Sequence, residues 1–367
     1  MAQLTFWGDF KANNTEHLNI SGELELLLNN SDVNVVNFEA PVKTKAKPIK
    51  KSGPNHSQSI DSPEWLESHG FNLISLANNH TFDYGEEGLV KTINSFNKAK
   101  VIGAGTYNDA YQRYITTTED GLKICFIAGT HAEFGTLTDT QNSYGTAWCF
   151  SPEFERNIRE KENIDFLIII NHAGIEYMKH PLPEWRETYK KWIDMGADAV
   201  IASHPHIPQG WENYKGKPIF YSLGNFCFQK DKANKEHWYE SLCVSLTIEK
   251  GKEMQCEVKP VIYDQDTGYI SENNAPDFAS YIQTLNNELK NDDTYYEYVN
   301  HYVKKIYKNY INNFTRSGII ANFSAKNIAK GIVEKFKKEH IYNCFNCESH
   351  RWAILRAMKG IYSIDGH

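Results

Sequence analysis

Short apolar runs alternate with amphipathic segments from the start of the chain to about residue 265, and this alternation constrains the fold most. The runs lie at residues 4–7, 33–38, 72–76, 123–129, 166–171, 199–202, 219–223 and 241–248. Runs of this length are typical of strands. Between them, the helical spacing of Leu89, Ile93 and Phe96 predicts a core-facing helix. The later runs do not alternate cleanly, so we expect an α/β fold whose sheet is covered on both faces.

Helical periodicity replaces this alternation after about residue 270. Candidate helices cover residues 281–289, 295–311, 325–336 and 351–361, and the pattern there predicts no strand. We therefore predict one domain at residues 1–268 and a helical C-terminal appendage at residues 269–367.

The appendage differs from the domain in charge. Residues 301–367 contain twelve lysine and arginine residues against four acidic ones, whereas the whole chain has a net charge of -7. The simplest interpretation is a solvated basic helix face. A second interpretation is that this face docks on the acidic domain, within the chain or across a homo-oligomer. Nucleic acid is an unexpected partner, because the sequence contains no recognisable reading motif.

Three features predict a cytoplasmic protein without a membrane segment. The longest apolar run, at residues 166–170, is far below the roughly 20 residues that a membrane-spanning helix requires. The first residues show no basic, apolar and small-residue pattern of an export signal. The seven cysteines are an odd number and lie mostly in apolar stretches, as expected of buried thiols in a reducing compartment.

Polar residues that can bind metals follow five of the predicted strands, at the edge where an open α/β sheet places its ligands. They are Asp9, Glu39, Asn78, Asn79, His80, Asp83, His172, Glu176, His204 and His206. Carboxylate, carboxamide and imidazole groups are typical ligands of Mn, Fe and Zn ions. A single histidine at a strand end is usually structural, but five such coincidences favour a site for divalent metal ions.

These residues lie in motifs that resemble the CapA-type proteins of capsule and poly-γ-glutamate synthesis, a branch of the calcineurin-like metallophosphoesterases. The resemblance covers about residues 4–228. It rests on GD at 8–9, NFEAP at 37–41, LANNH at 76–80, DYG at 83–85, GAG at 103–105, HAGIEY at 172–177, GADAVI at 196–201, HPH at 204–206 and YSLGNF at 221–226. It implies a layered, metallophosphoesterase-like mixed β-sheet core flanked by helices.

The resemblance also implies two metal sites that share a carboxylate. The ligands would be Asp9 and His206 at the first site, Asn79, His172 and His204 at the second, and Glu39 as the bridge. The sequence departs from the family at Lys11, where metallophosphoesterases commonly have a histidine. The first site therefore lacks the imidazole usual at this position and is weak, lysine-assisted or empty, so we expect one or two ions per chain.

His80 is the expected general acid by the same resemblance. If it is not a ligand, it can protonate a leaving oxygen, and Asp83 can fix its tautomer. Asp83 can equally be a turn residue that caps the following helix. Residues expected to contact the ligands or the substrate are Lys11, Asn78, His131, Glu176 and Asn225.

Two further motifs leave alternatives open. Lysines 43, 45, 47, 50 and 51 follow Glu39 closely. They form either a solvated loop or a positive field that favours anionic substrates such as phosphoesters or polycarboxylates. The set His340, Cys344, Cys347 and His350 has spacing compatible with a structural zinc site, but one Cys-x-x-Cys pair is weak evidence, and two unpaired thiols are the favoured interpretation.

These features support three functions. The first is a metal-dependent hydrolase of phosphoesters or an anionic polymer in capsule, polyglutamate or envelope polysaccharide metabolism. The second is a non-catalytic accessory protein that binds a polyanionic chain or a synthase. The third is a metal-dependent amide hydrolase or acyl transferase acting on γ-glutamyl or peptide bonds. His80 favours catalysis, whereas the missing imidazole at Lys11 favours binding.

Overall fold

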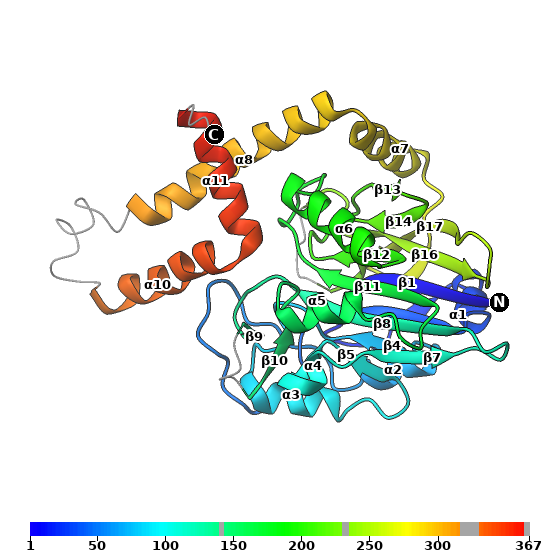
Figure 1. Ribbon diagram of the computed structural model, residues 1–367. Coiled ribbons are helices and arrows are strands. Elements are labelled where there is room, and N and C mark those ends of the chain that lie inside the picture. The colour runs from blue at the N-terminus through cyan, green and yellow to red at the C-terminus, as the bar shows by residue number, and fades with distance from the viewer. Residues whose placement is uncertain (139–142, 230–234, 316–329, 363–367) are drawn as a thin grey trace.

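The computed structural model describes residues 1–138, 143–229, 235–315 and 330–362, and Figure 1 shows its arrangement. The larger sheet has the strand order β2-β18-β17-β16-β1-β3-β4-β5, and β15 also pairs with β1. Strand β1 is parallel to β3 and β15 but antiparallel to β16, so the sheet is mixed. Its strands are β1 (Ala2–Lys11), β2 (Asn19–Ile20), β3 (Val33–Phe38), β4 (Leu73–Ser75), β5 (Lys100–Ile102), β15 (Asn225–Phe228), β16 (Glu240–Ile248), β17 (Gln255–Asp264) and β18 (Tyr269–Glu272).

A second sheet has the order β13-β14-β12-β11-β8-β7, with four parallel central strands and antiparallel edges. Its strands are β7 (Tyr114–Thr117), β8 (Lys123–Thr130), β11 (Phe166–His172), β12 (Ala199–Ser203), β13 (Trp211–Tyr214) and β14 (Lys217–Phe220). A small third sheet contains β6 (Ala104–Thr106), β9 (Thr136–Leu137) and β10 (Tyr144–Ala147).

The two large sheets pack face to face, and helices cover their outer faces. The rings of Phe6 on β1 and Phe126 on β8 meet in the apolar core between the sheets, with centroids 6.5 Å apart. On β11, Ile168 and Ile170 face this core, whereas Leu167 and Ile169 face the outer helices. Both faces of β11 are thus buried, which explains its uninterrupted apolar sequence. The helices of this part are α1 (Gly22–Asn29), α2 (Ser62–Ser68), α3 (Gly85–Ile93), α4 (Tyr107–Ala110), α5 (Pro152–Arg159) and α6 (Pro183–Met195).

The C-terminal segment is helical and packs on the α/β part. Figure 1 shows α8, α10 and α11 gathered on the side away from the N-terminus. Side chains of α8 and α11 join the same apolar cluster as Trp185 of α6. Two ion pairs also lie at this contact. In one, Arg356 of the C-terminal segment pairs with Glu184 of α6 at 2.8 Å. In the other, the arginine is on α6: Arg186 pairs with Asp292 of the C-terminal segment at 3.4 Å. Apolar packing and ion pairs therefore both contribute to this contact. The helices are α7 (Pro276–Lys290), α8 (Asp292–Thr315), α10 (Lys330–Asn346) and α11 (Glu348–Tyr362).

All eight expected strands are present with ends shifted by a few residues, and the described residues contain ten further strands, β17 and β18 among them. Strand β18 pairs with β17 directly after the expected boundary at residue 268, and the boundary itself stays a prediction. Part of the expected helix at residues 325–336 lies outside the described residues.

All seven cysteines are free, and all except Cys256 are buried. Among the described residues, no helix is both long and apolar enough to cross a membrane.

Candidate metal centre

Polar side chains from both large sheets meet at one edge. Asp9 lies on β1, Glu39 follows β3, His172 ends β11, and His204 and His206 follow β12. Strands β1 and β3 are parallel, as are β11 and β12, so each pair delivers its residues to the same end. Ligand atoms of Asp9, Glu39 and His172 all lie within 4.8 Å of one another, and the three residues are buried. The expected ligands of the metal centre are therefore neighbours in space.

His172 lies at the middle of this group. Its Nδ1 is 3.6 Å from Asp9 Oδ1, and its Nε2 is 3.8 Å from Glu39 Oε1. The same Nε2 is 3.1 Å from Asn79 Oδ1 and 3.1 Å from His204 Nδ1. Burial, and then the neighbouring histidines, hold the pKa of His172 well below its usual value. His172 is therefore neutral at pH 7, which is the form that binds metals.

Glu39 provides the test of whether a cation fits here. Its carboxylate is completely buried, and neither oxygen has a hydrogen-bond partner among the described residues. Burial, and then the charge of Asp9, raises the pKa of Glu39 well above its ordinary value. A buried carboxylate without partners is costly unless a proton or a cation neutralises it. Together with the neighbouring imidazoles, this donor set fits a divalent metal ion.

The turn that carries His204 and His206 has unusual backbone geometry. The φ angles of these residues are 105° and 60°, in a region that side chains other than glycine rarely adopt. Such conformations cost on the order of 1–3 kcal/mol each and cluster at functional sites. The turn places His206 Nε2 3.6 Å from Glu39 Oε1, while Asn225 Oδ1 holds His206 Nδ1 at 3.0 Å. Asn225 thus orients His206, as expected of a residue that contacts a ligand.

A second group of buried side chains surrounds His80. Its Nδ1 is 2.7 Å from Asp83 Oδ2, and Lys51 pairs with Asp83 Oδ1 and lies 3.1 Å from the same His80 nitrogen. Asp83 Oδ2 also accepts the backbone N–H of His56 at 2.6 Å. The carboxylate of Asp83 therefore orients His80 and does not cap α3, whose N-terminus has no side-chain cap. Asn78 accepts the His80 backbone N–H at 3.1 Å, which fixes the loop.

Lys51 and Asn37 are two residues of this site whose importance the sequence did not indicate. Lys51 is buried, whereas the other lysines of its loop are exposed, and only the fold distinguishes it from them. Asn37 Nδ2 donates to Asp9 Oδ1 at 2.7 Å and lies 3.1 Å from His172 Nδ1. Lys11 is placed differently from a metal ligand, since its ammonium donates to Asn13 Oδ1 and the carbonyl of Gln229.

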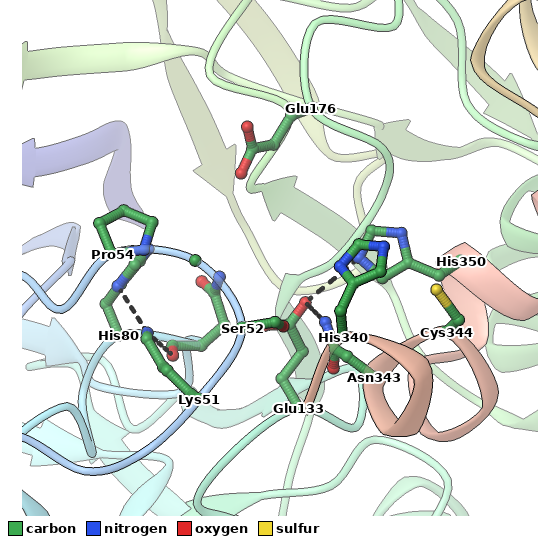
Figure 2. A pocket seen from close by; sticks show the side chains of 12 residues that line it. Lys51, Ser52, Pro54, His80, Glu133, Glu176, His340, Asn343, Cys344 and His350 are labelled. Atoms are coloured by element: carbon green, nitrogen blue, oxygen red, sulfur yellow. Dashed lines mark hydrogen bonds and ion pairs between the residues drawn. The ribbon is translucent and has the colours of Figure 1, made fainter. Parts of the chain in front are cut away.

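A polar pocket of about 190 Å³ adjoins the centre. Lys51 and His80 contribute to one side, and Asn79 and Glu176 also line the pocket. Figure 2 shows the opposite wall, to which the C-terminal helices contribute His340, Asn343, Cys344 and His350. Beneath this wall, His131 is buried with its ring 4.6 Å from that of His204. Glu133 also lines the pocket, and no sequence motif indicated it.

Comparison with known proteins places this arrangement in context. The chain is 31% identical over 213 residues to the capsule biosynthesis protein CapA of Bacillus anthracis, covering 55% of this chain and 52% of the relative. It is 30% identical over 244 residues to the PGA biosynthesis protein CapA of Bacillus subtilis, covering 65% and 63%. A third relative, from Mycobacterium tuberculosis, is named "Probable polyglutamine synthesis accessory protein" and is 24% identical over 220 residues, covering 56% and 58%.

Each match covers only part of the relative, and all three relatives are named for the synthesis of a capsule or a polymer. The chain spans about half to two thirds of the length of these relatives. The family model described as "Bacterial capsule synthesis protein PGA_cap" matches residues 1–230, which include every expected ligand of the metal centre. The chain belongs to the PGA_cap family of bacterial capsule synthesis proteins.

Proposed function

We propose that this protein is a metal-dependent hydrolase that cleaves a phosphoester or an anionic polymer in capsule or polyglutamate metabolism. The observation that carries the proposal is the Glu39 carboxylate, which is buried without a hydrogen-bond partner in the described structure and faces His172 and His206. Asp9, Glu39 and His206 would hold one ion, and Asn79, His172 and His204 would hold a second beside it. A divalent ion at this centre supplies a Lewis acid that polarises a phosphoryl or acyl oxygen.

The His80 group would provide proton transfer. Asp83 holds Nδ1 of His80, so Nε2 is the nitrogen left for a substrate in the adjoining pocket. Burial and the Lys51 ammonium lower the pKa of His80. Once protonated, a histidine with a lowered pKa gives up its proton readily, which suits a group that protonates a leaving oxygen.

An accessory binding role is the second candidate, and Lys11 favours it. Its ammonium is held by Asn13 and the carbonyl of Gln229, so the first metal site has no imidazole from β1. The exposed lysines after Glu39 would attract a polyanionic chain towards the same edge. The name of the mycobacterial relative also refers to an accessory protein. Under this alternative, the metal centre would bind a polyanion without cleaving it.

The deciding experiment measures metal content, turnover and binding on one preparation. The protein is stripped with a chelator, reloaded with Mn²⁺, Fe²⁺ or Zn²⁺, and assayed on a nitrophenyl phosphomonoester, a phosphodiester, a γ-glutamyl anilide and poly-γ-glutamate. Metal-dependent phosphoester or polymer cleavage that is lost in His80→Ala supports the hydrolase. Cleavage of the anilide alone would transfer the proposal to amide chemistry. Full metal occupancy with polymer binding but no turnover would establish the accessory role.

A further inference from the structure

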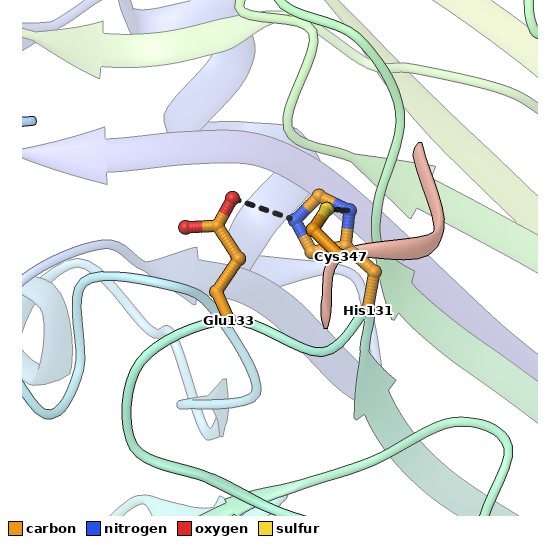
Figure 3. A group of neighbouring side chains, drawn as sticks. All are labelled: His131, Glu133 and Cys347. Carbon is orange, nitrogen blue, oxygen red and sulfur yellow. Dashed lines mark hydrogen bonds and ion pairs between the residues drawn. The ribbon is translucent and has the colours of Figure 1, made fainter. Parts of the chain in front are cut away.

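A second group of potential metal ligands lies beside the centre, where the C-terminal helices meet the α/β part. It consists of His131, Glu133 and Cys347, whose ligand atoms all lie within 4.8 Å of one another (Figure 3). His131 and Glu133 follow β8, whereas Cys347 is the residue between α10 and α11. The group therefore joins two segments that are more than 200 residues apart in sequence.

His131 presents an unsatisfied nitrogen to this group. Its side chain is completely buried, its Nδ1 lies 2.9 Å from Ser349 Oγ, and its Nε2 has no hydrogen-bond partner in the described part of the chain. Glu133 Oε1 is 3.7 Å from Nε2, which is too long for a hydrogen bond. Buried polar atoms without partners are uncommon and call for an explanation such as an ion. The separation is compatible with two ligands of one metal after a small contraction, since zinc lies about 2.0–2.2 Å from nitrogen and oxygen ligands.

His350 is arranged around Glu133 in the same way as His131. Its Nδ1 is 2.7 Å from the Tyr310 hydroxyl, and its Nε2 is 3.7 Å from the same Glu133 Oε1. In both histidines a hydroxyl group thus contacts Nδ1, while Nε2 is directed to one carboxylate oxygen. Proteins orient metal-binding imidazoles in this way, through a hydrogen bond at the nitrogen that does not bind the metal.

Cys347 adds a buried thiol to the group. It is completely buried, and its Sγ is 3.6 Å from His131 Nδ1. Cys344, the other cysteine of the Cys-x-x-Cys pair, lines the pocket beside the centre and is not part of the group. The two cysteines of the Cys-x-x-Cys motif thus lie in different surroundings, and the fold brings His131 and Glu133 to Cys347 from another segment.

We propose that His131, Glu133 and Cys347, with His350 as the fourth ligand, bind one zinc ion that ties the C-terminal helices to the α/β part. One sulfur, two imidazoles and one carboxylate are a four-ligand set suited to tetrahedral zinc. The ion would fix the position of the wall formed by α10 and α11, to which Asn343 and His350 contribute pocket residues. This site does not depend on whether the protein is a hydrolase.

Cobalt is the probe that separates this site from the main centre. The full chain is stripped with a chelator and titrated with Co²⁺. A thiolate ligand gives cobalt an intense near-ultraviolet charge-transfer band, whereas the main centre contains only nitrogen and oxygen ligands. We expect one such band, whose intensity at saturation corresponds to one thiolate-bound cobalt ion per chain. Its absence from the wild-type protein would overturn the proposal.

Two matched variants assign the band. Cys347→Ser should remove it, whereas Cys344→Ser, which changes the neighbouring buried cysteine of the pair, should keep it. Glu39→Gln should also keep it, so a failure of the main metal centre is distinguishable from a failure of this site. A band that survives in Cys347→Ser, or that disappears only in Cys344→Ser, would contradict the assignment. If Cys347→Ser does not fold, zinc-edge X-ray absorption on the reloaded wild-type protein should show one sulfur neighbour, and a zinc shell without sulfur would refute the site.

Discussion

Replacing Glu39 by glutamine tests the electrostatics of the metal centre without any knowledge of the substrate. The Glu39 carboxylate is buried and has no hydrogen-bond partner among the described residues, so in the metal-free protein it keeps its proton to an unusually high pH. Glutamine has nearly the same shape and no charge. We therefore expect Glu39→Gln to stabilise the metal-free protein at neutral pH and to weaken metal binding.

The size of the stability difference between the two proteins follows from the direction of the Glu39 pKa shift. Above about pH 4.5, the usual pKa of the side chain, the unfolded chain has lost the Glu39 proton while the folded protein still binds it. The free energy of unfolding then falls by about 1.4 kcal/mol for each pH unit, until the pH reaches the raised pKa. The free energy of unfolding of Glu39→Gln lacks this dependence on pH. Asp9 and the histidines titrate in both proteins, so the difference between them reports Glu39 and its coupling to Asp9.

Urea denaturation in the presence of a chelator, at several values between pH 4.5 and 8, measures this difference. The variant should gain stability over the wild type as the pH rises. Adding Mn²⁺ at about 100 times its dissociation constant should then stabilise the wild type by about 2.7 kcal/mol and the variant by much less. Glu253→Gln, which removes an exposed carboxylate in the turn between β16 and β17, away from the centre, is the control and should behave like the wild type. A difference that does not change with pH, or an equal gain from Mn²⁺, would refute the reasoning.

Three other changes test the remaining parts of the site. His204→Ala removes a buried proposed ligand that lies 3.1 Å from His172, and should abolish binding at the proposed second metal site; full occupancy after dialysis, measured by plasma emission, would contradict that role. His80→Ala should lower kcat on the order of 10² to 10⁴ with metal content unchanged, and loss of metal instead would make His80 a ligand. Neutralising Lys45, Lys47 and Lys50, all exposed, should weaken binding of an anionic substrate and flatten its salt dependence, since such charges act through a field screened over roughly 10 Å at about 0.1 M salt. An unchanged salt slope would make this loop a solvated surface.

Local patterns predicted most of the central strands because these strands are buried. The apolar run at residues 166–170 has no polar break, since alternate residues of β11 face the other sheet and the outer helices. Strand β17 was not predicted, because its first residues, Gln255, Cys256 and Glu257, are exposed and polar or small. Its pairing with β16, and not its own composition, makes it a strand.

The sequence by itself determined which residues follow the buried strands, and therefore that Asp9, Glu39, His172 and His204 would lie at one edge. The motifs that contain them also indicated the family, because the spacing of those residues along the chain is a local property. Only the tertiary structure decided which of five similar lysines is buried. Lys51 contacts Asp83 and His80 because a loop folds back over α3, and no local pattern records that path.

Contacts across long sequence separations are also decided by the tertiary structure alone. The spacing of Cys344 and Cys347 was compatible with a zinc pair but favoured two unpaired thiols, and only the fold shows that one lines the pocket while the other faces His131. Glu133 carried no signal at all, because a single acidic residue in a loop is usually solvated. Its environment depends on how the C-terminal helices pack through apolar residues of α8 and α11. Packing of this kind depends on shape and burial over the whole molecule, and short-range residue patterns do not contain that information.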